Sequence, residues 1–120
     1  MAVKSYKDLI VWQKSMDLVE AVYQATGQFP KEEVYALTNQ IRRSAVSVPS
    51  NIAEGQARRS TPEFSRFLSF ARGSLAELET QLLIACRLNY LNSQQLDRIM
   101  ETHEEVSKML PALIAKLASN

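Results

Sequence analysis

The chain has 120 residues, of which 46% are hydrophobic and 22% are charged, and its formal net charge is +1. This length and composition predict one soluble globular domain spanning residues 1–120. The single cysteine, Cys86, excludes an internal disulfide, and no apolar run has the length of a signal peptide or a membrane span. We therefore expect a cytoplasmic protein with no membrane partner.

Three breaks divide the chain into four long segments that each have the apolar spacing of an α-helix. The breaks fall at residues 27–30, 58–62 and 89–93. Between them, apolar or semi-polar side chains recur at alternating steps of three and four, which places them on one helix face. Since short connections join antiparallel neighbours, the sequence predicts an all-α protein, an antiparallel up-down-up-down four-helix bundle. In chain order, the predicted core positions are Leu9, Trp12, Met16, Val19, Tyr23 and Thr26; Val34, Leu37, Ile41, Ala45, Val48 and Ile52; Phe64, Phe67, Ala71, Leu75, Leu78, Leu82 and Ala85; and Leu96, Ile99, His103, Val106, Leu110, Leu113 and Leu117.

Residue types near the breaks agree with four helices. Ser5 and Asp8 are the candidates to cap the start of the first helix. Asn92, followed three residues later by Gln95, resembles a capping box at the start of the fourth. Pro111 lies inside the fourth helix, where it removes one backbone hydrogen bond and should bend the helix.

The second predicted helix also carries a polar stripe beside its apolar one, with members at steps of four and three. A loop would not keep this phase, so we expect the helix to continue through Pro49. If the chain turns near Arg59, an antiparallel third helix places Ser44 and Ser47 opposite small residues, which favours close approach. A binding or catalytic site on Asn51 and Glu54 is the alternative. The predicted polar seam between the two helices comprises Gln40, Ser44, Ser47, Asn51, Glu54, Gly73 and Ser74.

Several of these residues, together with others, match the pattern of a known family. The matching positions are Trp12, Phe29-Pro30, Glu33, Gln40, Arg42-Arg43, Ser47, Pro49, Asn51 to Gly55, Phe67-Leu68, Gly73 to Leu75, Glu77 to Glu79 and Asn89 to Leu91. Over about residues 6–115, the chain resembles the bacterial four-helix-bundle family named for open reading frames in intervening sequences of 23S ribosomal RNA genes.

The resemblance implies a small cytoplasmic protein without enzymatic activity. The family is similar to the accessory variability proteins of diversity-generating retroelements, which form homopentamers that bind nucleic acid and a reverse transcriptase. By this analogy we expect a homo-oligomer, a pentamer, with RNA or DNA and a reverse-transcriptase-like protein as partners.

Basic residues are concentrated between residues 40 and 75. This segment contains six arginines and two glutamates, which gives it a net charge of +4. The planar guanidinium group of arginine matches phosphate, and assembly of several copies would multiply the effect. The alternatives are a salt-bridged surface, in which Glu54 pairs with Arg58, and arginines buried between subunits. The residues predicted to bind nucleic acid are Arg42, Arg43, Arg58, Arg59, Arg66 and Arg72.

His103 is the only histidine, and it falls on the apolar stripe of the fourth helix. We expect a buried histidine with a hydrogen-bond partner. The alternatives are a metal ligand, or a base acting with Glu54 across a subunit boundary. One histidine and one cysteine are too few for a zinc site within one chain, and Cys86 is expected to be a packing residue. The sequence therefore predicts neither a metal nor a cofactor.

Leu18, Val22, Leu68 and Phe70 lie partly off the predicted stripes. This wider apolar face predicts a second contact, with another subunit or a partner helix. Together these features predict a non-enzymatic, homo-oligomeric binding or assembly module that binds nucleic acid. A purely structural oligomer serving an unknown protein partner is the second hypothesis, and an intersubunit hydrolase is the third.

Overall fold

A computed structural model of the chain describes residues 5–119 and contains four α-helices. They are α1 (Ile10–Thr26), α2 (Leu37–Ala57), α3 (Thr61–Arg87) and α4 (Ser93–Ala118), with short 3-10 turns at η1 (Tyr6–Asp8) and η2 (Lys31–Glu33). No strand occurs in residues 5–119. The predicted all-α class and the number of helices are therefore confirmed.

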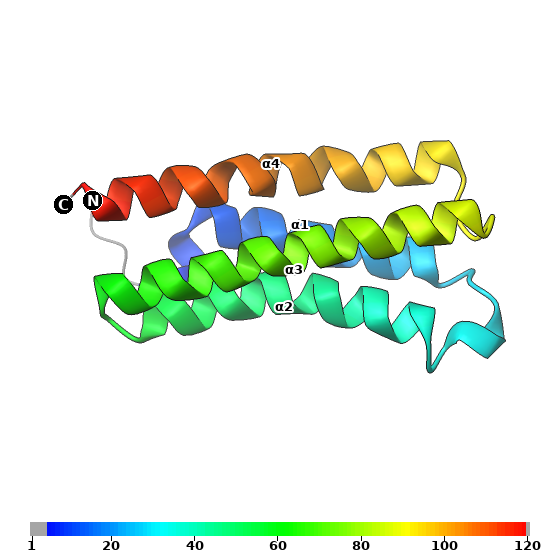
Figure 1. The fold of residues 1–120 in the computed structure, drawn as a ribbon, viewed down its shortest axis with the longest axis horizontal. Helices are drawn as coiled ribbons and strands as arrows, with labels where there is room; N and C mark the ends of the chain where they lie inside the picture. The colour runs from blue at the N-terminus through cyan, green and yellow to red at the C-terminus, as the bar shows by residue number, and fades with distance from the viewer. Residues whose placement is uncertain (1–4, 120) are drawn as a thin grey trace.

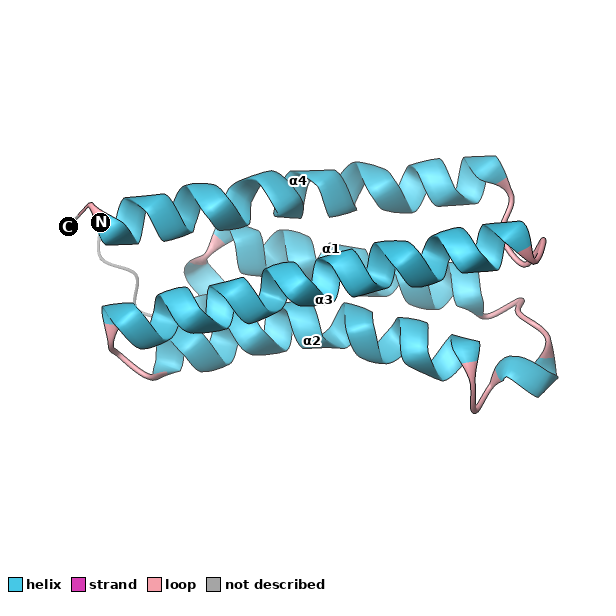
Figure 2. Ribbon diagram, viewed as in Figure 1, coloured by secondary structure: helices cyan, strands magenta, loops and turns pink. Residues whose placement is uncertain are grey.

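The four helices lie side by side along the long axis of a body measuring 46 × 24 × 19 Å (Figure 1). α2 packs against α1 and α3, and α4 packs against the same two helices from the other side. The connections lie at the two ends of the body, drawn as pink loops in Figure 2. Each helix thus contacts two others along much of its length, which buries one broad face of each.

Local sequence signals explain where α4 begins but not where α1 begins. Asn92 and Gln95 form the predicted capping box, with hydrogen bonds of 2.8 and 2.9 Å between each side chain and the other residue's backbone N–H. Ser5 and Asp8 form a similar box, but it caps the short η1 turn, and α1 begins only at Ile10.

The buried face of α1 differs from the predicted one. Met16 and Tyr23 were expected in the core, but they are 42% and 43% exposed, whereas Leu18 and Val22 are fully buried. The small Ser15 lies on the buried face, and its hydroxyl donates to the carbonyl of Val11 at 2.7 Å. Because a serine satisfied within its own helix can pack between helices, the apolar spacing alone did not identify this face.

This rotation of α1 also changes the prediction of a second apolar contact. Leu18, Val22 and Leu68 are fully buried in the core of the single chain, so they do not form an additional surface. Phe70 is about half exposed and remains available to contact a partner. Val34, expected at the start of the second helix's core stripe, lies exposed in the connection before α2.

The long connection between α1 and α2 is fastened to the connection between α3 and α4. The hydroxyl of Tyr90 donates to Glu33 Oε2 at 2.8 Å, and the rings of Phe29 and Tyr90 lie 5.5 Å apart between centroids. The other carboxylate oxygen of Glu33 accepts from the backbone N–H of Leu37 at 3.3 Å. One carboxylate therefore fixes both the connection and the first residue of α2.

This contact predicts a specific loss of stability at high pH. The hydrogen bond to the Glu33 carboxylate, aided by burial, raises the pKa of Tyr90 above its ordinary value. The contribution of the protonated phenol to stability is complete below the unfolded tyrosine pKa of about 10, and it is lost as pH rises through the higher folded pKa. In urea unfolding between about pH 8 and pH 11, the wild type should lose more stability than Tyr90→Phe. If the free energy of unfolding fell equally with pH in the two proteins, the Tyr90–Glu33 hydrogen bond would not be the cause of the loss.

Candidate functional site

The predicted seam between the second and third helices is formed at one point, Ser44. α2 is continuous from Leu37 to Ala57 with Pro49 inside it, as the phase of the polar stripe predicted. The hydroxyl of Ser44 lies 2.9 Å from Gln81 Oε1 and 3.1 Å from Glu77 Oε1 on α3. Ser44 and Gln81 are both buried, so these contacts join the two helices by polar groups within their interface.

The other members of the stripe make their polar contacts elsewhere. Ser47 donates to the carbonyl of Ser44, and Asn51 Nδ2 donates to the carbonyl of Ser47, at 2.9 and 2.8 Å. Glu54 pairs with Arg58 one turn further along α2. Gln40 is exposed. Most of the stripe therefore satisfies its polar groups within α2, and only Ser44 has the role predicted for the whole set.

The prediction that Gly73 and Ser74 take part in the polar seam between α2 and α3 is wrong. Gly73 is exposed, and a Cβ atom built on it would have nothing within 4 Å. Ser74 donates to the carbonyl of Phe70 in its own helix. The prediction paired residues of the two helices by their distance in sequence from the turn. This gives the position of Gly73 along the axis of α3, but not the direction in which Gly73 points around that axis. Since Ala71 faces the core, a residue two positions later points about 200° around the helix, away from the interface.

The close approach of α2 and α3 lies instead at Gly55. A Cβ atom on Gly55 would lie 2.6 Å from the Cβ of Phe67 and 3.2 Å from Cδ1 of Phe64. The chain turns sharply beyond this point, where Arg59 has the left-handed φ of 56° and Ser60 caps α3. Glycine at position 55 is what allows the two helices to converge toward this short turn.

Two of the six predicted nucleic-acid-binding arginines are engaged in ion pairs at the α2–α3 turn. Arg58 lies 3.4 Å from Glu54 and 3.6 Å from Glu63, and Arg66 lies 3.1 Å from Glu63. Both guanidinium groups also lie over the ring of Phe67, at 5.0 and 5.7 Å from its centroid. The two glutamates therefore offset part of the positive charge at this end of the molecule.

The other four arginines are spread over different parts of the surface. Arg42 Nε donates to Thr26 Oγ1 at 2.9 Å, which holds this arginine against α1. Arg43, Arg59 and Arg72 are exposed, and none of them has an ion pair with any of residues 5–119. Arg42 and Arg58 are separated by about 24 Å along α2, from a rise of about 1.5 Å per residue. One chain therefore does not bring the six arginines together on a single surface.

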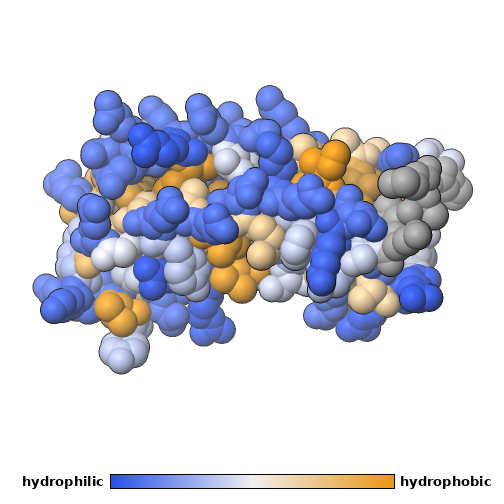
Figure 3. All heavy atoms as spheres, turned by 180° about the vertical axis from the view of Figure 1, so that it is seen from behind, coloured by the Kyte–Doolittle hydropathy of each residue, from blue (hydrophilic) through white to orange (hydrophobic). Residues whose placement is uncertain are grey.

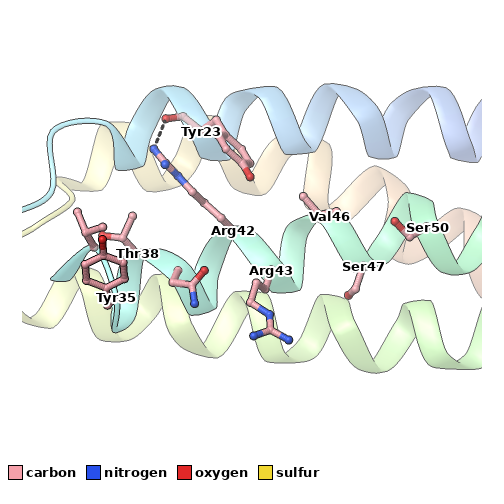
Figure 4. Close-up of a pocket in the computed structure, with 10 residues that line it drawn as sticks. Tyr23, Tyr35, Thr38, Arg42, Arg43, Val46, Ser47 and Ser50 are labelled. Carbon is pink, nitrogen blue, oxygen red and sulfur yellow. Dashed lines mark hydrogen bonds between the residues drawn. The ribbon is translucent and has the colours of Figure 1, made fainter.

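A hollow of about 680 Å³ lies over the first half of α2 and its junction with α1 (Figure 4). Figure 4 shows Arg42 reaching toward Tyr23 on α1, whereas Arg43 points toward α3. Within the part of the chain that the structure describes, no carboxylate lines the hollow. Of its residues, sequence reasoning selected Arg42, Arg43 and Ser47 for a site or the seam and placed Tyr23 and Val34 in the core, but it did not name the other five. The lining residues are Tyr23, Val34, Tyr35, Thr38, Asn39, Arg42, Arg43, Val46, Ser47 and Ser50.

His103 has the buried structural position that the sequence favoured. Its Nε2 lies 2.8 Å from the carbonyl oxygen of Leu75, and Nδ1 lies 3.4 Å from the hydroxyl of Ser107. A carbonyl oxygen only accepts, so Nε2 carries the hydrogen. Glu54, which could act with His103 only across a subunit boundary, pairs with Arg58 in this chain.

The remaining candidates for metal or thiol chemistry have little support. Among residues 5–119, no three His, Cys, Asp or Glu side chains are grouped so that they could hold a metal ion. Burial, with a smaller effect of Asp97, raises the pKa of the Cys86 thiol, which disfavours the reactive thiolate. None of the helices between residues 5 and 119 has the length and apolar character needed to cross a membrane.

These features define a small four-helix protein with one polar helix–helix seam and a basic, aromatic hollow. The chain belongs to the 23S rRNA-intervening sequence protein family, which matches residues 7–112, as the resemblance predicted. It is similar, at 25% identity and a TM-score of 0.78, to the crystal structure of a protein of unknown function from the S23 ribosomal protein family of Bacteroides thetaiotaomicron. That match covers 88% of this chain and 98% of the other. No curated protein matches the sequence.

Proposed function

We propose that this protein is a non-enzymatic, cytoplasmic, homo-oligomeric module that binds nucleic acid through phosphate contacts of arginines on α2 and α3. The observation that supports this most is the set of exposed arginines that have no ion pair among residues 5–119, Arg43, Arg59 and Arg72. They lie in a segment whose net charge is +4. An exposed guanidinium without a carboxylate partner is free to bind a phosphate group.

Assembly is part of the proposal because the arginines of one chain lie on different faces. Symmetric copies repeat each arginine around an axis, so several weak phosphate contacts can act on one nucleic-acid strand. The resemblance to retroelement accessory proteins favours a pentamer of up-down-up-down bundles and a reverse-transcriptase-like protein as a further partner.

A purely structural oligomer is the second candidate function, and exposed apolar side chains favour it. Leu83, Ile84 and Leu88 lie close together in sequence near the C-terminal end of α3, and each is nearly half exposed. Figure 3 shows that, on the rear face, apolar patches are separated by hydrophilic side chains. Scattered apolar side chains are normal on a protein surface, so the cluster of Leu83, Ile84 and Leu88, and not the separate patches, supports this candidate.

Gel-shift titration with the intact oligomer tests the nucleic-acid proposal. We expect retardation of a labelled RNA or DNA at about 25 mM salt and a loss of affinity of several orders of magnitude by about 200 mM. A variant with Arg43→Gln, Arg59→Gln and Arg72→Gln should reduce the slope of log affinity against log salt by about 1 for each phosphate contact that the oligomer loses. No retardation at low salt would refute the proposal.

A matched control removes three positive charges elsewhere. Arg98→Gln, Lys108→Gln and Lys116→Gln change exposed residues of α4 that have no ion pair among residues 5–119. The net charge changes equally in the two triple variants. An equal loss of binding in both would show a nonspecific effect of net charge and would exclude a site on α2 and α3.

A further inference from the structure

The hollow beside α1 and α2 combines aromatic rings with positive charge. Within residues 5–119, its lining includes two tyrosines and two arginines but no Asp or Glu. The first turn of α2, which supplies Thr38 and Asn39 to the lining, also contains no acidic residue. The N-terminal end of α2 adds no free positive charge, because the Glu33 carboxylate accepts from the backbone N–H of Leu37. The two arginines of the lining are what favour a ligand that carries negative charge.

Part of this hollow is rigid before any ligand binds. The guanidinium carbon of Arg42 lies 4.4 Å from the centroid of the Tyr23 ring, and Arg42 Nε is held by the hydroxyl of Thr26. Thr26 in turn donates to the carbonyl of Val22 at 2.8 Å. A positive charge is thus fixed in place on one wall, at low conformational cost to binding.

Two other side chains that line the hollow, Tyr35 and Arg43, remain free to contact a ligand. Tyr35 is 94% exposed, although it lies in a connection fastened by the Glu33–Tyr90 hydrogen bond. Arg43 is exposed and has no ion pair within the described chain. An exposed ring on a fastened connection and an unpaired guanidinium line the same hollow, and these are the kinds of groups that hold single-stranded nucleic acid.

Thr38 gives an independent sign that the hollow is incomplete. The residue is only 5% exposed, and its hydroxyl oxygen is the single buried side-chain polar atom within residues 5–119 that has no hydrogen-bond partner. Buried polar groups in proteins nearly always have a partner, so an exception calls for an explanation. Thr38 lines the hollow, but its hydroxyl oxygen is closed to solvent, so a bound ligand can supply the missing hydrogen bond only after this side chain rotates toward the hollow.

We propose that this hollow binds a single-stranded segment of nucleic acid, with an unpaired base stacked on Tyr35 and a phosphate of the same strand on Arg43. The inference rests on the proposed nucleic-acid function and adds the site and the form of the ligand. A base within a duplex has its faces covered by neighbouring pairs, so only an unpaired base can stack on Tyr35.

Fluorescence anisotropy with the full chain tests the proposal. The probes are a labelled oligothymidine of about 15 nucleotides, long enough for one binding groove, and a labelled duplex of the same length, each at low salt. Tyr35→Ala should weaken binding of the single strand by about 5- to 150-fold, the range expected when one base no longer stacks on an aromatic ring, whereas Tyr35→Phe should keep nearly full affinity. Arg43→Gln should weaken binding, and the control Arg98→Gln on α4 should not.

The outcomes separate this inference from the proposed function. Preference for the single strand, together with loss in Tyr35→Ala and retention in Tyr35→Phe, supports the hollow as the site. Equal binding of duplex and single strand, with no effect of Tyr35→Ala, overturns the hollow but leaves nucleic-acid binding by other arginines intact. Absence of binding to either probe overturns both. A change of oligomer size in Tyr35→Ala, measured by light scattering, would make the hollow a subunit contact and also overturn the inference.

Discussion

Replacing Gly55 with alanine is expected to destabilise the protein by about 1–2 kcal/mol, although alanine is the better helix former. The added Cβ atom would lie 2.6 Å from the Cβ of Phe67 and 3.2 Å from the ring of Phe64. Both Cβ atoms are fixed to helical backbone, so neither can rotate away, and α2 and α3 must separate. Because both Cβ atoms are fixed, the overpacking cost should lie in the upper part of the usual range, at about 2–3 kcal/mol, and the gain in helix propensity offsets about 1 kcal/mol.

Gly73→Ala is the matched control, because this glycine also lies inside a helix. Nothing lies within 4 Å of its added Cβ atom, so the substitution should stabilise the protein by about 0.5–1 kcal/mol through helix propensity and reduced unfolded-state entropy. Urea unfolding with light scattering at the same protein concentration measures both changes. The two substitutions should have opposite signs. Stabilisation by both would contradict the close approach at Gly55.

The sequence was sufficient to predict the helices and the continuity of α2. The step pattern that includes Ser44, Ser47 and Asn51 keeps the same phase on both sides of Pro49, and a chain that broke at the proline would have lost it. The cap at Asn92 is also a local feature, visible in a few adjacent residues. These properties are determined by neighbours in the sequence and were predicted correctly, whereas the predicted cap at Ser5 and Asp8 belongs to η1 and not to the first helix.

Properties that depend on how helices are rotated against each other were predicted less well. The apolar rhythm of α1 is ambiguous, because the predicted stripe through Met16 and the buried stripe through Leu18 differ by only one residue, and the small polar Ser15 lies on the buried one. Likewise, Gly55 and Gly73 both suit a close approach by composition. Only the contact of Gly55 with Phe67 distinguishes them.

The candidate site was predicted only in part, for the same reason. Arg42 and Arg43 were identified by charge, since six arginines in one segment are visible in the sequence. Tyr35 was missed because its exposure depends on where α2 begins, and that point is set by the contact of Glu33 with Tyr90, 57 residues away. The unpaired hydroxyl of Thr38 has no signal in the sequence, because pairing is a property of the packed structure.

Replacing His103 with alanine is expected to reduce the free energy of unfolding by about 2–4 kcal/mol. The imidazole is 4% exposed and donates to the carbonyl of Leu75, so it joins α4 to α3 inside the protein. Removing it leaves a cavity and deprives a buried carbonyl of one hydrogen bond, and both effects destabilise the fold. For a chain of this size, thermal unfolding should shift down by about 4 °C for each kcal/mol lost.

Two further variants separate packing from hydrogen bonding. His103→Gln keeps an amide N–H that can donate to the Leu75 carbonyl, so it should recover part of the stability lost in His103→Ala. Ser107→Ala removes only a contact of 3.4 Å, so it should cost less than about 1 kcal/mol. If His103→Ala instead unfolds with wild-type stability, the histidine does not contribute to packing. Its burial would then need another explanation, and the hypothesis of a hydrolytic role with Glu54 of a neighbouring subunit would regain support.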